Sequence, residues 1–121
     1  MKLVVIAVIL LLLEQIVAKK CSEAPGVDGC SIPDWIPNKN KFKPACYKHD
    51  VCYACGTALD VNRITCDRRF LFNCYERCGD KTNCRRVAGW YYKAVRWFGA
   101  FAYQTVSPEW CTEDWVSECM L

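Results

Sequence analysis

Eight residues decide the fold: Cys46-Tyr47-Lys48-His49-Asp50-Val51-Cys52-Tyr53, a stretch that contains the only histidine of the chain. Pro44 suits the first position of a helix, and Gly56 suits the position just past its end. Unpaired buried polar groups cost about 1–3 kcal/mol each, so a polar helix face needs hydrogen-bonding or charged partners opposite it. At helical spacing, one face of this helix carries a cysteine, an imidazole, a carboxylate and a phenol: Cys46, His49, Asp50 and Tyr53.

This polar face has two interpretations. In the first, it is a solvated surface and His49 has no special role. Exposed helix faces seldom place cysteines beside polar groups, because cysteine is among the most buried residue types. We therefore favour the second interpretation, in which His49 is a catalytic imidazole and Asp50 is a metal-binding carboxylate.

The pattern C-x-x-H-D-x-C-Y resembles the active-site helix of secreted phospholipases A2. The wider stretch Phe42-x-x-Ala45-Cys46-x-x-His49-Asp50 is more similar to the short members of that family, which are the prokaryotic and fungal type and the conodipines of cone-snail venom. The resemblance covers residues 24–103. Beyond it, residues 104–121 form a C-terminal extension for which the sequence suggests no function. We expect a short helix there, stapled to the body by Cys111 and Cys119 and beginning near Ser107-Pro108.

The N-terminus and the cysteines indicate a secreted, extracellular protein. Residues 1–18 are typical of a secretory signal, with Lys2, an apolar run too short to predict a membrane span, and Ala18 as the cleavage residue. Residues 19–121 then form a single domain that holds all eleven cysteines. So much cysteine in a small chain predicts a disulfide-stapled fold, and a single histidine argues against zinc. The odd count leaves one cysteine free or bonded to another chain.

The charge balance limits the partners of the chain. Its formal net charge is +3, and the value stays +3 when Lys2 and Glu14 leave with the signal. A mildly basic chain favours an anionic surface, but this charge is too weak to predict binding to nucleic acid.

A glycine-rich loop, Gly26-Val27-Asp28-Gly29-Cys30-Ser31, is a candidate calcium site. Taken alone, its Asp-Gly step predicts only a turn. Calcium prefers carboxylate and carbonyl oxygens, and Asp50 would add a carboxylate if a Cys30–Cys46 disulfide tied the loop to the helix. In the prokaryotic-type enzymes, a similar Asp-x-Cys segment supplies a carboxylate and a neighbouring carbonyl. The calcium ligands that the resemblance implies here are Asp28, Gly29 and Asp50.

A second helix is expected from a cap at Asp60 to about Cys78. Its inner stripe is apolar or cysteine except for Asp67. A lone buried carboxylate would neutralise unless it were paired, and His49 is the natural partner. The resemblance implies that Asp67 orients the histidine. Tyr53 lies one turn from His49 and is positioned to donate its hydroxyl to the same carboxylate.

A third helix is expected after a short turn that a Cys78–Cys84 disulfide brackets, and it should end near Tyr103. It carries a broad apolar stripe that is rich in aromatic residues. Such stripes more often belong to the core than to a binding site, and we expect most of this one in the core. The stripe consists of Val87, Trp90, Tyr91, Ala94, Val95, Phe98, Phe101 and Ala102.

The same helix has a basic side that is a candidate lipid-facing surface. Tyr92 and Trp97 fall outside the apolar stripe and are positioned to meet lipid. Conodipines carry a light chain released by removal of a propeptide after the second helix. Only five residues separate Cys78 from Cys84 here, so no propeptide is visible, and Arg85-Arg86 is better interpreted as surface than as a cleavage site. The basic residues of this side are Arg85, Arg86, Lys93 and Arg96.

Together these features predict an all-α, disulfide-rich phospholipase A2-like fold with two antiparallel, cross-linked active-site helices, a calcium loop and a third, aromatic-rich helix. The resemblance implies the function, which is calcium-dependent hydrolysis of the sn-2 ester of glycerophospholipids at a membrane or micelle surface. His49 is the expected base that activates water, with Asp67 and Tyr53 beside it, and no serine stands in a nucleophile-elbow pattern. An N–H of Gly29 or Cys30 would complete an oxyanion hole. The alternative is a weak or inactive phospholipase A2-like venom or binding protein.

Overall fold

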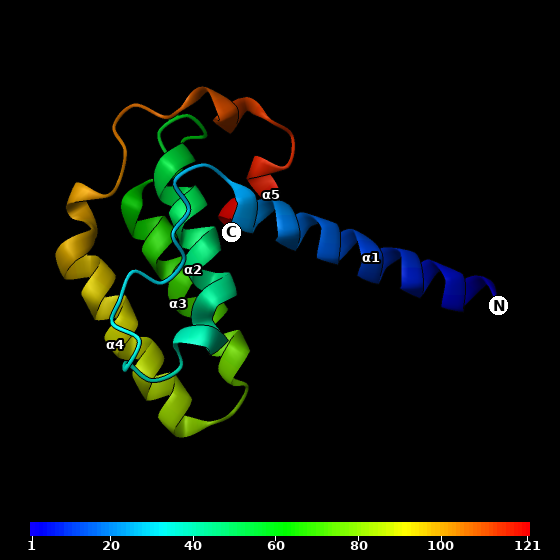
Figure 1. Ribbon diagram of the computed structural model, residues 1–121, viewed down its shortest axis with the longest axis horizontal. Coiled ribbons are helices and arrows are strands. Elements are labelled where there is room, and N and C mark those ends of the chain that lie inside the picture. Colours follow the sequence, from blue (N-terminus) through cyan, green and yellow to red (C-terminus); the bar gives the residue numbers. More distant parts are fainter.

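Helices and the loops between them make up the part of the chain that the structure describes (Figure 1). The computed structural model describes the backbone of residues 1–121 and the side chains of residues 1–13, 15 and 21–121. Within these residues there is no strand, and the predicted all-α fold class is confirmed. The elements are α1 (Lys2–Glu23), α2 (Lys39–Cys55), α3 (Arg63–Cys78), α4 (Thr82–Phe98), the 3₁₀ turns η1 (Gly99–Phe101) and η2 (Glu109–Thr112), and α5 (Val116–Met120).

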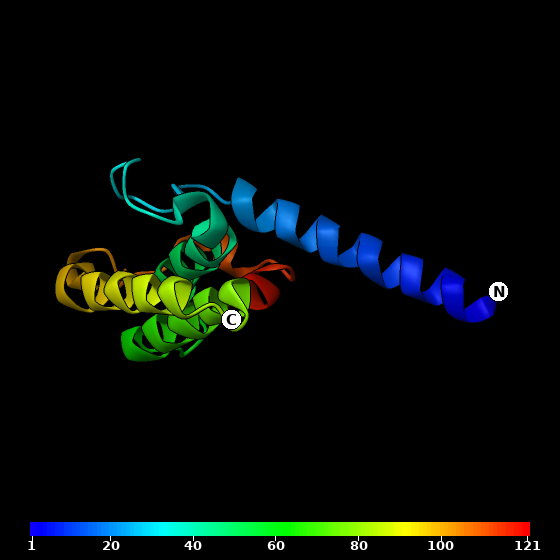
Figure 2. The same ribbon diagram turned by 90° about the horizontal axis from the view of Figure 1, so that it is seen from below.

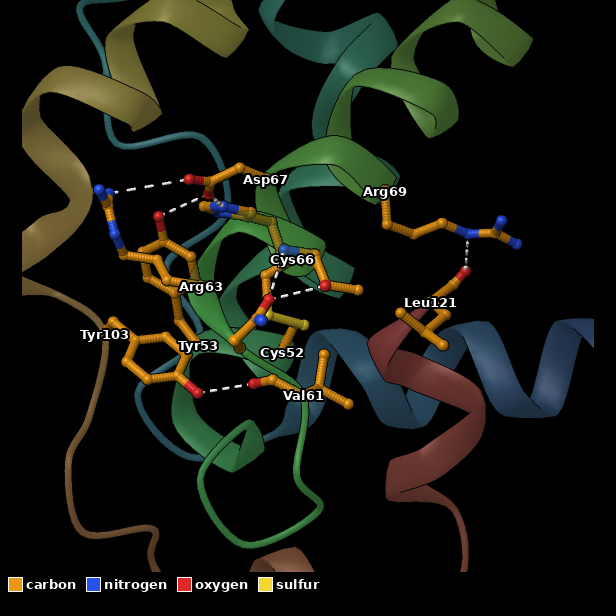
Figure 3. Close-up of a disulfide and its surroundings, with 12 residues drawn as sticks. Cys52, Tyr53, Val61, Arg63, Cys66, Asp67, Arg69, Tyr103 and Leu121 are labelled. Atoms are coloured by element: carbon orange, nitrogen blue, oxygen red, sulfur yellow. Dashed lines mark hydrogen bonds and ion pairs between the residues drawn. A yellow bond between two sulfur atoms is a disulfide. The ribbon is translucent and has the colours of Figure 1, made fainter.

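The helices α2 and α3 are antiparallel neighbours. A Cys52–Cys66 disulfide joins the C-terminal part of α2 to the N-terminal part of α3, and Figure 3 shows it between the two helices. At the other end of the pair, Arg77 Nε donates to Lys41 O at 3.1 Å. This is the cross-linked helix pair that the sequence predicts.

The start of α2 differs from the prediction. The helix begins at Lys39, five residues before Pro44, so the expectation that Pro44 opens it is wrong. The side chain of Phe42 is fully buried and meets the ring of Tyr91 edge-on. Burying an aromatic side chain contributes about 1.5–3 kcal/mol, which favours the additional turn despite the N–H that proline lacks. Gly56 follows the last helical residue, as predicted.

The N-terminus of α3 is capped by Asn62 and not by the predicted Asp60. The Asn62 side chain accepts a hydrogen bond from Thr65 N at 3.0 Å, as an N-cap does. Asp60 has a φ of 59° and lies in the turn before the helix, so its left-handed backbone does not suit a cap. At the other end of α3, the predicted Cys78–Cys84 disulfide is present and joins α3 to α4.

The helix α4 is shorter than predicted, because it ends at Phe98 and continues as the turn η1 instead of reaching Tyr103. The backbone at Gly99 approaches Tyr53 so closely that an added Cβ would lie 2.5 Å from the tyrosine hydroxyl. Beyond η1 the chain turns, and Gln104 N donates to Tyr53 O at 3.1 Å. The end of α4 is therefore set by its contact with α2.

Residues 104–121 form two short elements, η2 and α5, in place of the one helix predicted. In Figure 1 this segment passes over the end of α2 and returns beside α1. The predicted stapling is confirmed, since Cys111 is bonded to Cys55 and Cys119 to Cys21. All four sulfurs belong to buried residues, so the extension is part of the core and not a free tail.

The helix α1 extends away from the rest of the molecule, as Figures 1 and 2 show. Its large apolar side chains between residues 3 and 13 are exposed. In the part of the chain whose side chains are described, no helix is long and apolar enough to cross a membrane. The predicted cleavage residue, Ala18, lies outside the residues whose side chains are described.

Cys74 is the cysteine without a disulfide partner among the described residues. Its side chain is fully buried in the core that α2, α3 and α4 share, and burial raises the pKa of its thiol to about 12. A thiol with no exposed surface does not reach a second chain in the folded protein. Of the two states expected for the odd cysteine, the intermolecular disulfide is therefore not supported.

Candidate active site

The polar face of α2 borders an apolar cleft of about 790 Å³. Its walls come from the loop of residues 29–37, from α2 and from the C-terminal half of α4. His49, Asp50 and Tyr53 contribute the polar groups of α2, and apolar side chains form most of the remaining lining. The cleft therefore brings together an apolar channel and the polar residues that the sequence singles out.

His49 and Asp67 are in contact across the α2–α3 pair. His49 Nε2 lies 2.7 Å from Asp67 Oδ1, with the His49 side chain 8% exposed and the Asp67 side chain 0% exposed. The Cys52–Cys66 disulfide holds the two helices together here, since Cys52 is one turn beyond His49 and Cys66 directly precedes Asp67. Figure 3 shows Asp67 beside this disulfide. The predicted contact between the histidine and the buried carboxylate is present.

Tyr53 reaches the same carboxylate. Its hydroxyl donates to Asp67 Oδ1 at 2.5 Å, and its ring centroid lies 4.1 Å from that of His49. Burial and the hydrogen bond to Asp67 raise the pKa of the Tyr53 hydroxyl, so it remains a donor. The absence of a side chain at Gly99 leaves room for the hydroxyl at this position.

Two arginines also approach Asp67, and neither was predicted from the sequence to lie at the site. Arg96 Nη1 donates to Asp67 Oδ2 at 2.6 Å, and Arg63 Nη1 lies 3.7 Å from the same oxygen. The prediction that Arg96 belongs to a basic, lipid-facing surface is therefore wrong. The place of Arg63 could have been predicted, because residues four apart on one helix are neighbours and Arg63 stands four residues before Asp67. No sequence pattern predicted the place of Arg96, since only the packing of α4 against α3 brings it to Asp67.

These contacts explain how a carboxylate with no exposed surface stays charged. Burial alone would raise the pKa of Asp67, but the hydrogen bonds from His49, Tyr53 and Arg96 outweigh burial and hold the pKa below its usual value. An ionised carboxylate only accepts hydrogen bonds, so His49 Nε2 carries the proton and Nδ1 keeps its lone pair. The imidazole is thus held in the tautomer that leaves Nδ1 free to accept a proton.

Asp50 has a different set of partners. Asp50 Oδ2 accepts hydrogen bonds from the backbone N–H of Asp28 at 3.2 Å and of Gly29 at 3.0 Å. Burial and the nearby charge of Asp28 raise the pKa of the Asp50 carboxyl to about 7, in spite of these hydrogen bonds. The predicted Cys30–Cys46 disulfide is present and ties this loop to α2. The loop and the helix therefore meet at two carboxylates.

The chemistry of these donors suits calcium. Calcium prefers oxygen ligands, and the carboxylates of Asp28 and Asp50 lie near enough to repel each other. The Gly29 N–H faces Asp50, so a carbonyl ligand at Gly29 stays a prediction. Over the described side chains, no group of three or more His, Cys, Asp or Glu residues could hold a metal. A calcium ion bound here would therefore need backbone carbonyls and water to complete its six to eight oxygens.

The mouth of the cleft is aromatic. Val87 and Tyr91 of the α4 stripe are buried, as expected, whereas Trp90 and Phe98 of the same stripe are exposed and line the cleft. Trp35 joins them from the loop and is 79% exposed. The stripe is wider than the surface that α3 covers, so its outer residues lie outside the core. We call Trp35, Trp90 and Phe98 the aromatic rim.

Comparisons with known proteins give relatives for part of this chain. Conodipine-P2 and conodipine-P1 of Conus purpurascens are each 48% identical to it over 44 residues, which is 36% of this chain and 25% of each relative. The conodipine-M alpha chain of Conus magus is 33% identical over 57 residues, or 46% of this chain and 74% of that relative. The match thus spans about a quarter of the length of the Conus purpurascens relatives.

No solved structure matches the chain. A family model described as prokaryotic phospholipase A2 matches residues 18–99, a range that contains α2, α3 and α4 together with every residue of the candidate site. Since the match covers more than half of the chain, the protein belongs to the prokaryotic phospholipase A2 family.

Proposed function

We propose that this protein is a secreted, calcium-dependent phospholipase A2 that hydrolyses the sn-2 ester of glycerophospholipids. The observation that carries the proposal is the His49–Asp67 contact of 2.7 Å beside an apolar cleft that Asp50 also borders. A candidate base, its orienting carboxylate and a candidate metal ligand thus meet where an acyl chain would be accommodated. Membership of the family supports the same reaction.

His49 acts as the general base in this proposal. Because Asp67 engages Nε2, it is Nδ1 that takes a proton from water while the water oxygen attacks the ester carbonyl carbon. The bond between that carbon and the glycerol oxygen then breaks, and the imidazolium returns the proton to the leaving alkoxide. Asp67 stabilises the imidazolium while it exists, and Tyr53 holds Asp67 in place.

We assign the calcium ligands to Asp28, Asp50 and the carbonyl of Gly29. The chemistry that calcium would supply there is neutralisation of the substrate phosphate and polarisation of the ester carbonyl. Among the protein groups, the Gly29 N–H is engaged by Asp50. This favours the N–H of Cys30 as the donor to the oxyanion that develops on the substrate.

The aromatic rim is the proposed entrance for phospholipid. Trp35, Trp90 and Phe98 are exposed at the cleft, and aromatic side chains favour the headgroup level of a membrane. Arg86 and Lys93 are exposed on α4 and would add attraction to anionic lipid. We therefore propose peripheral contact with a membrane or micelle, with the mouth of the cleft toward the lipid.

Secretion is part of the same proposal. Residues 1–18 have the composition of a secretory signal, and their removal would take away the exposed apolar part of α1. The described residues contain five disulfides, which persist in oxidising compartments. The mature chain would then begin near Lys19.

The test of this function is release of fatty acid from phosphatidylcholine vesicles. We expect release from the sn-2 position in the presence of calcium and none in excess chelator. A protein that binds the vesicles with calcium but releases no more fatty acid than its His49→Gln variant is instead the inactive, phospholipase A2-like binding protein. Release that continues in chelator removes calcium from the mechanism.

A further inference from the structure

We propose that Arg96 is a positioning residue, which fixes the far oxygen of Asp67 so that Asp67 holds His49 in one orientation. The proposal rests on the proposed function, in which His49 is the base. Arg96 comes from α4, a helix that contributes neither the candidate base nor its carboxylate. Its contact with Asp67 is therefore a third, independent support for the pair.

The two oxygens of Asp67 have separate partners. His49 Nε2 at 2.7 Å and Tyr53 Oη at 2.5 Å both engage Oδ1, and both come from α2. Arg96 Nη1 engages Oδ2 at 2.6 Å. A carboxylate held only through Oδ1 can rotate about its Cβ–Cγ bond, because that torsion is broad. A charge-assisted donor on Oδ2 removes this freedom and fixes the plane in which His49 is bound.

Arg96 is also the closer of two permanently charged partners, because Arg63 Nη1 lies 3.7 Å from Oδ2, beyond hydrogen-bond distance. As the base, His49 must be neutral before it accepts a proton, and the Tyr53 hydroxyl is neutral when it donates its hydrogen bond. An anionic carboxylate with 0% exposure that had only neutral partners would be costly, because charges buried without a counter-charge are poorly solvated. The Arg96 side chain is 29% exposed, so it supplies the charge without being fully desolvated itself.

Arg63 holds the segment from which Arg96 extends. Arg63 Nη1 donates to Val95 O at 3.1 Å and to Arg96 O at 3.4 Å, and Nη2 donates to Arg96 O at 3.3 Å. These carbonyls belong to the last turn of α4, where the helix dipole favours a cation. The contacts thus continue from the end of α4 through Arg96 and Asp67 to His49.

The first test compares variants of Arg96 on a monomeric short-chain phosphatidylcholine at saturating calcium. Arg96→Gln should lower kcat by about 10- to 100-fold with little change in KM, because misplacing a catalytic group slows the chemical step. Arg96→Lys should recover part of that loss, since it restores the charge. Arg68→Gln, the same substitution at an exposed position of α3 that does not line the cleft, is the matched control. A folded Arg96→Gln variant with the kcat of the Arg68→Gln control overturns the proposal.

A double-mutant cycle separates positioning from general damage to the fold. If Arg96 acts through Asp67, then Arg96→Gln should lower kcat much less in the Asp67→Asn background than in the wild type. If the fold-loss in kcat of the double variant equals the product of the losses of the two single variants, Arg96 affects turnover by a route other than Asp67. That result would overturn the proposal.

The third measurement does not depend on turnover. The chain has one histidine, so the imidazole ¹⁵N resonances report on His49 alone. At about pH 8, above the ordinary imidazole pKa, the wild type and Arg68→Gln should show the tautomer with the proton on Nε2. Arg96→Gln should show a mixture of the two tautomers. An unchanged single tautomer overturns the role of Arg96, whereas a wild type that keeps this tautomer but releases no fatty acid contradicts only the proposed function.

Discussion

The two carboxylates nearest His49 have opposite surroundings. Asp67 has no exposed surface, and its pKa is nevertheless lowered, because hydrogen bonds from His49, Tyr53 and Arg96 outweigh its burial. Asp50 is less completely buried, and its pKa is nevertheless raised to about 7, because burial and a neighbouring carboxylate outweigh two backbone N–H donors. The hydrogen-bonding and charged partners of each carboxylate, and not its exposed area alone, set the direction of its pKa shift.

The difference teaches that the partners of a buried carboxylate decide what it can do. The charge of Asp67 is matched by the protein, so Asp67 is suited to orient another group. The charge of Asp50 is not matched, so Asp50 is suited to receive a cation from solution. Both are aspartates on helices with a cysteine within two residues, and they differ in the partners that the fold brings to them.

The largest expected effect comes from the histidine between the two carboxylates. His49→Gln should lower kcat by about 10²–10⁴-fold, since it removes the proposed base, and should leave calcium binding nearly unchanged. Turnover on phosphatidylcholine and a calorimetric calcium titration measure the two quantities. If His49→Gln also lost calcium affinity, the histidine would belong to the metal site, and the separate roles of Asp50 and Asp67 would no longer hold.

Exchanging each carboxylate for its amide sharpens the contrast. Asp50→Asn should raise the calcium concentration for half-maximal activity by about 10-fold or more, because the site loses a charged ligand. Asp67→Asn should lower kcat and leave that concentration unchanged. Calcium titrations of fatty-acid release from both variants check this. The opposite assignment of the two effects would reverse the proposed roles.

The pH dependence of stability should also differ between them. Because the pKa of Asp50 is raised to about 7, the unfolded chain loses this proton at lower pH than the folded chain does. Without calcium, this group therefore lowers the free energy of unfolding as the pH rises from about 4 to about 7. The lowered pKa of Asp67 acts in the opposite sense: its contribution is present at neutral pH and is lost as the pH falls below about 4.

Thermal unfolding with chelator or with calcium, at about pH 5 and about pH 8, measures this difference. Calcium at 100 times its Kd should stabilise the wild type by about 2.7 kcal/mol at the higher pH, and by less at the lower pH where protons compete. Asp50→Asn should lose both the calcium effect and its share of the pH dependence. An equal calcium effect at the two pH values would mean that the ion binds elsewhere.

The smallest expected effect concerns the cleft that Asp50 borders. Trp35→Ala should weaken binding to phosphatidylcholine vesicles by about 5-fold, which corresponds to about 1 kcal/mol of partial burial. Phe72→Ala on α3 is the control, since Phe72 is also exposed but does not line the cleft. Vesicle sedimentation gives both affinities. Equal losses would show that lipid does not approach through the aromatic rim.

Much of the site was predictable because its signals are local or chemically exceptional. Helical spacing alone put His49, Asp50 and Tyr53 on one face. Asp67 stood out as a carboxylate in an otherwise apolar and cysteine-rich stripe, and the chain offers one histidine to pair with it. The Cys30–Cys46 and Cys78–Cys84 disulfides were predictable because each ties a loop or turn to a helix that is near in sequence.

The sequence by itself therefore determined the helices, the polar face and the histidine–aspartate pair, since each follows from periodicity or from the cost of burying a charge. Only the tertiary structure decided which cation reaches Asp67 and which aromatic residues stay outside the core. Arg96 is 29 residues from Asp67, and Trp35 meets Phe98 only across the cleft. Such contacts depend on how α4 packs against α3 and the loop, and no periodicity along a single helix encodes that packing.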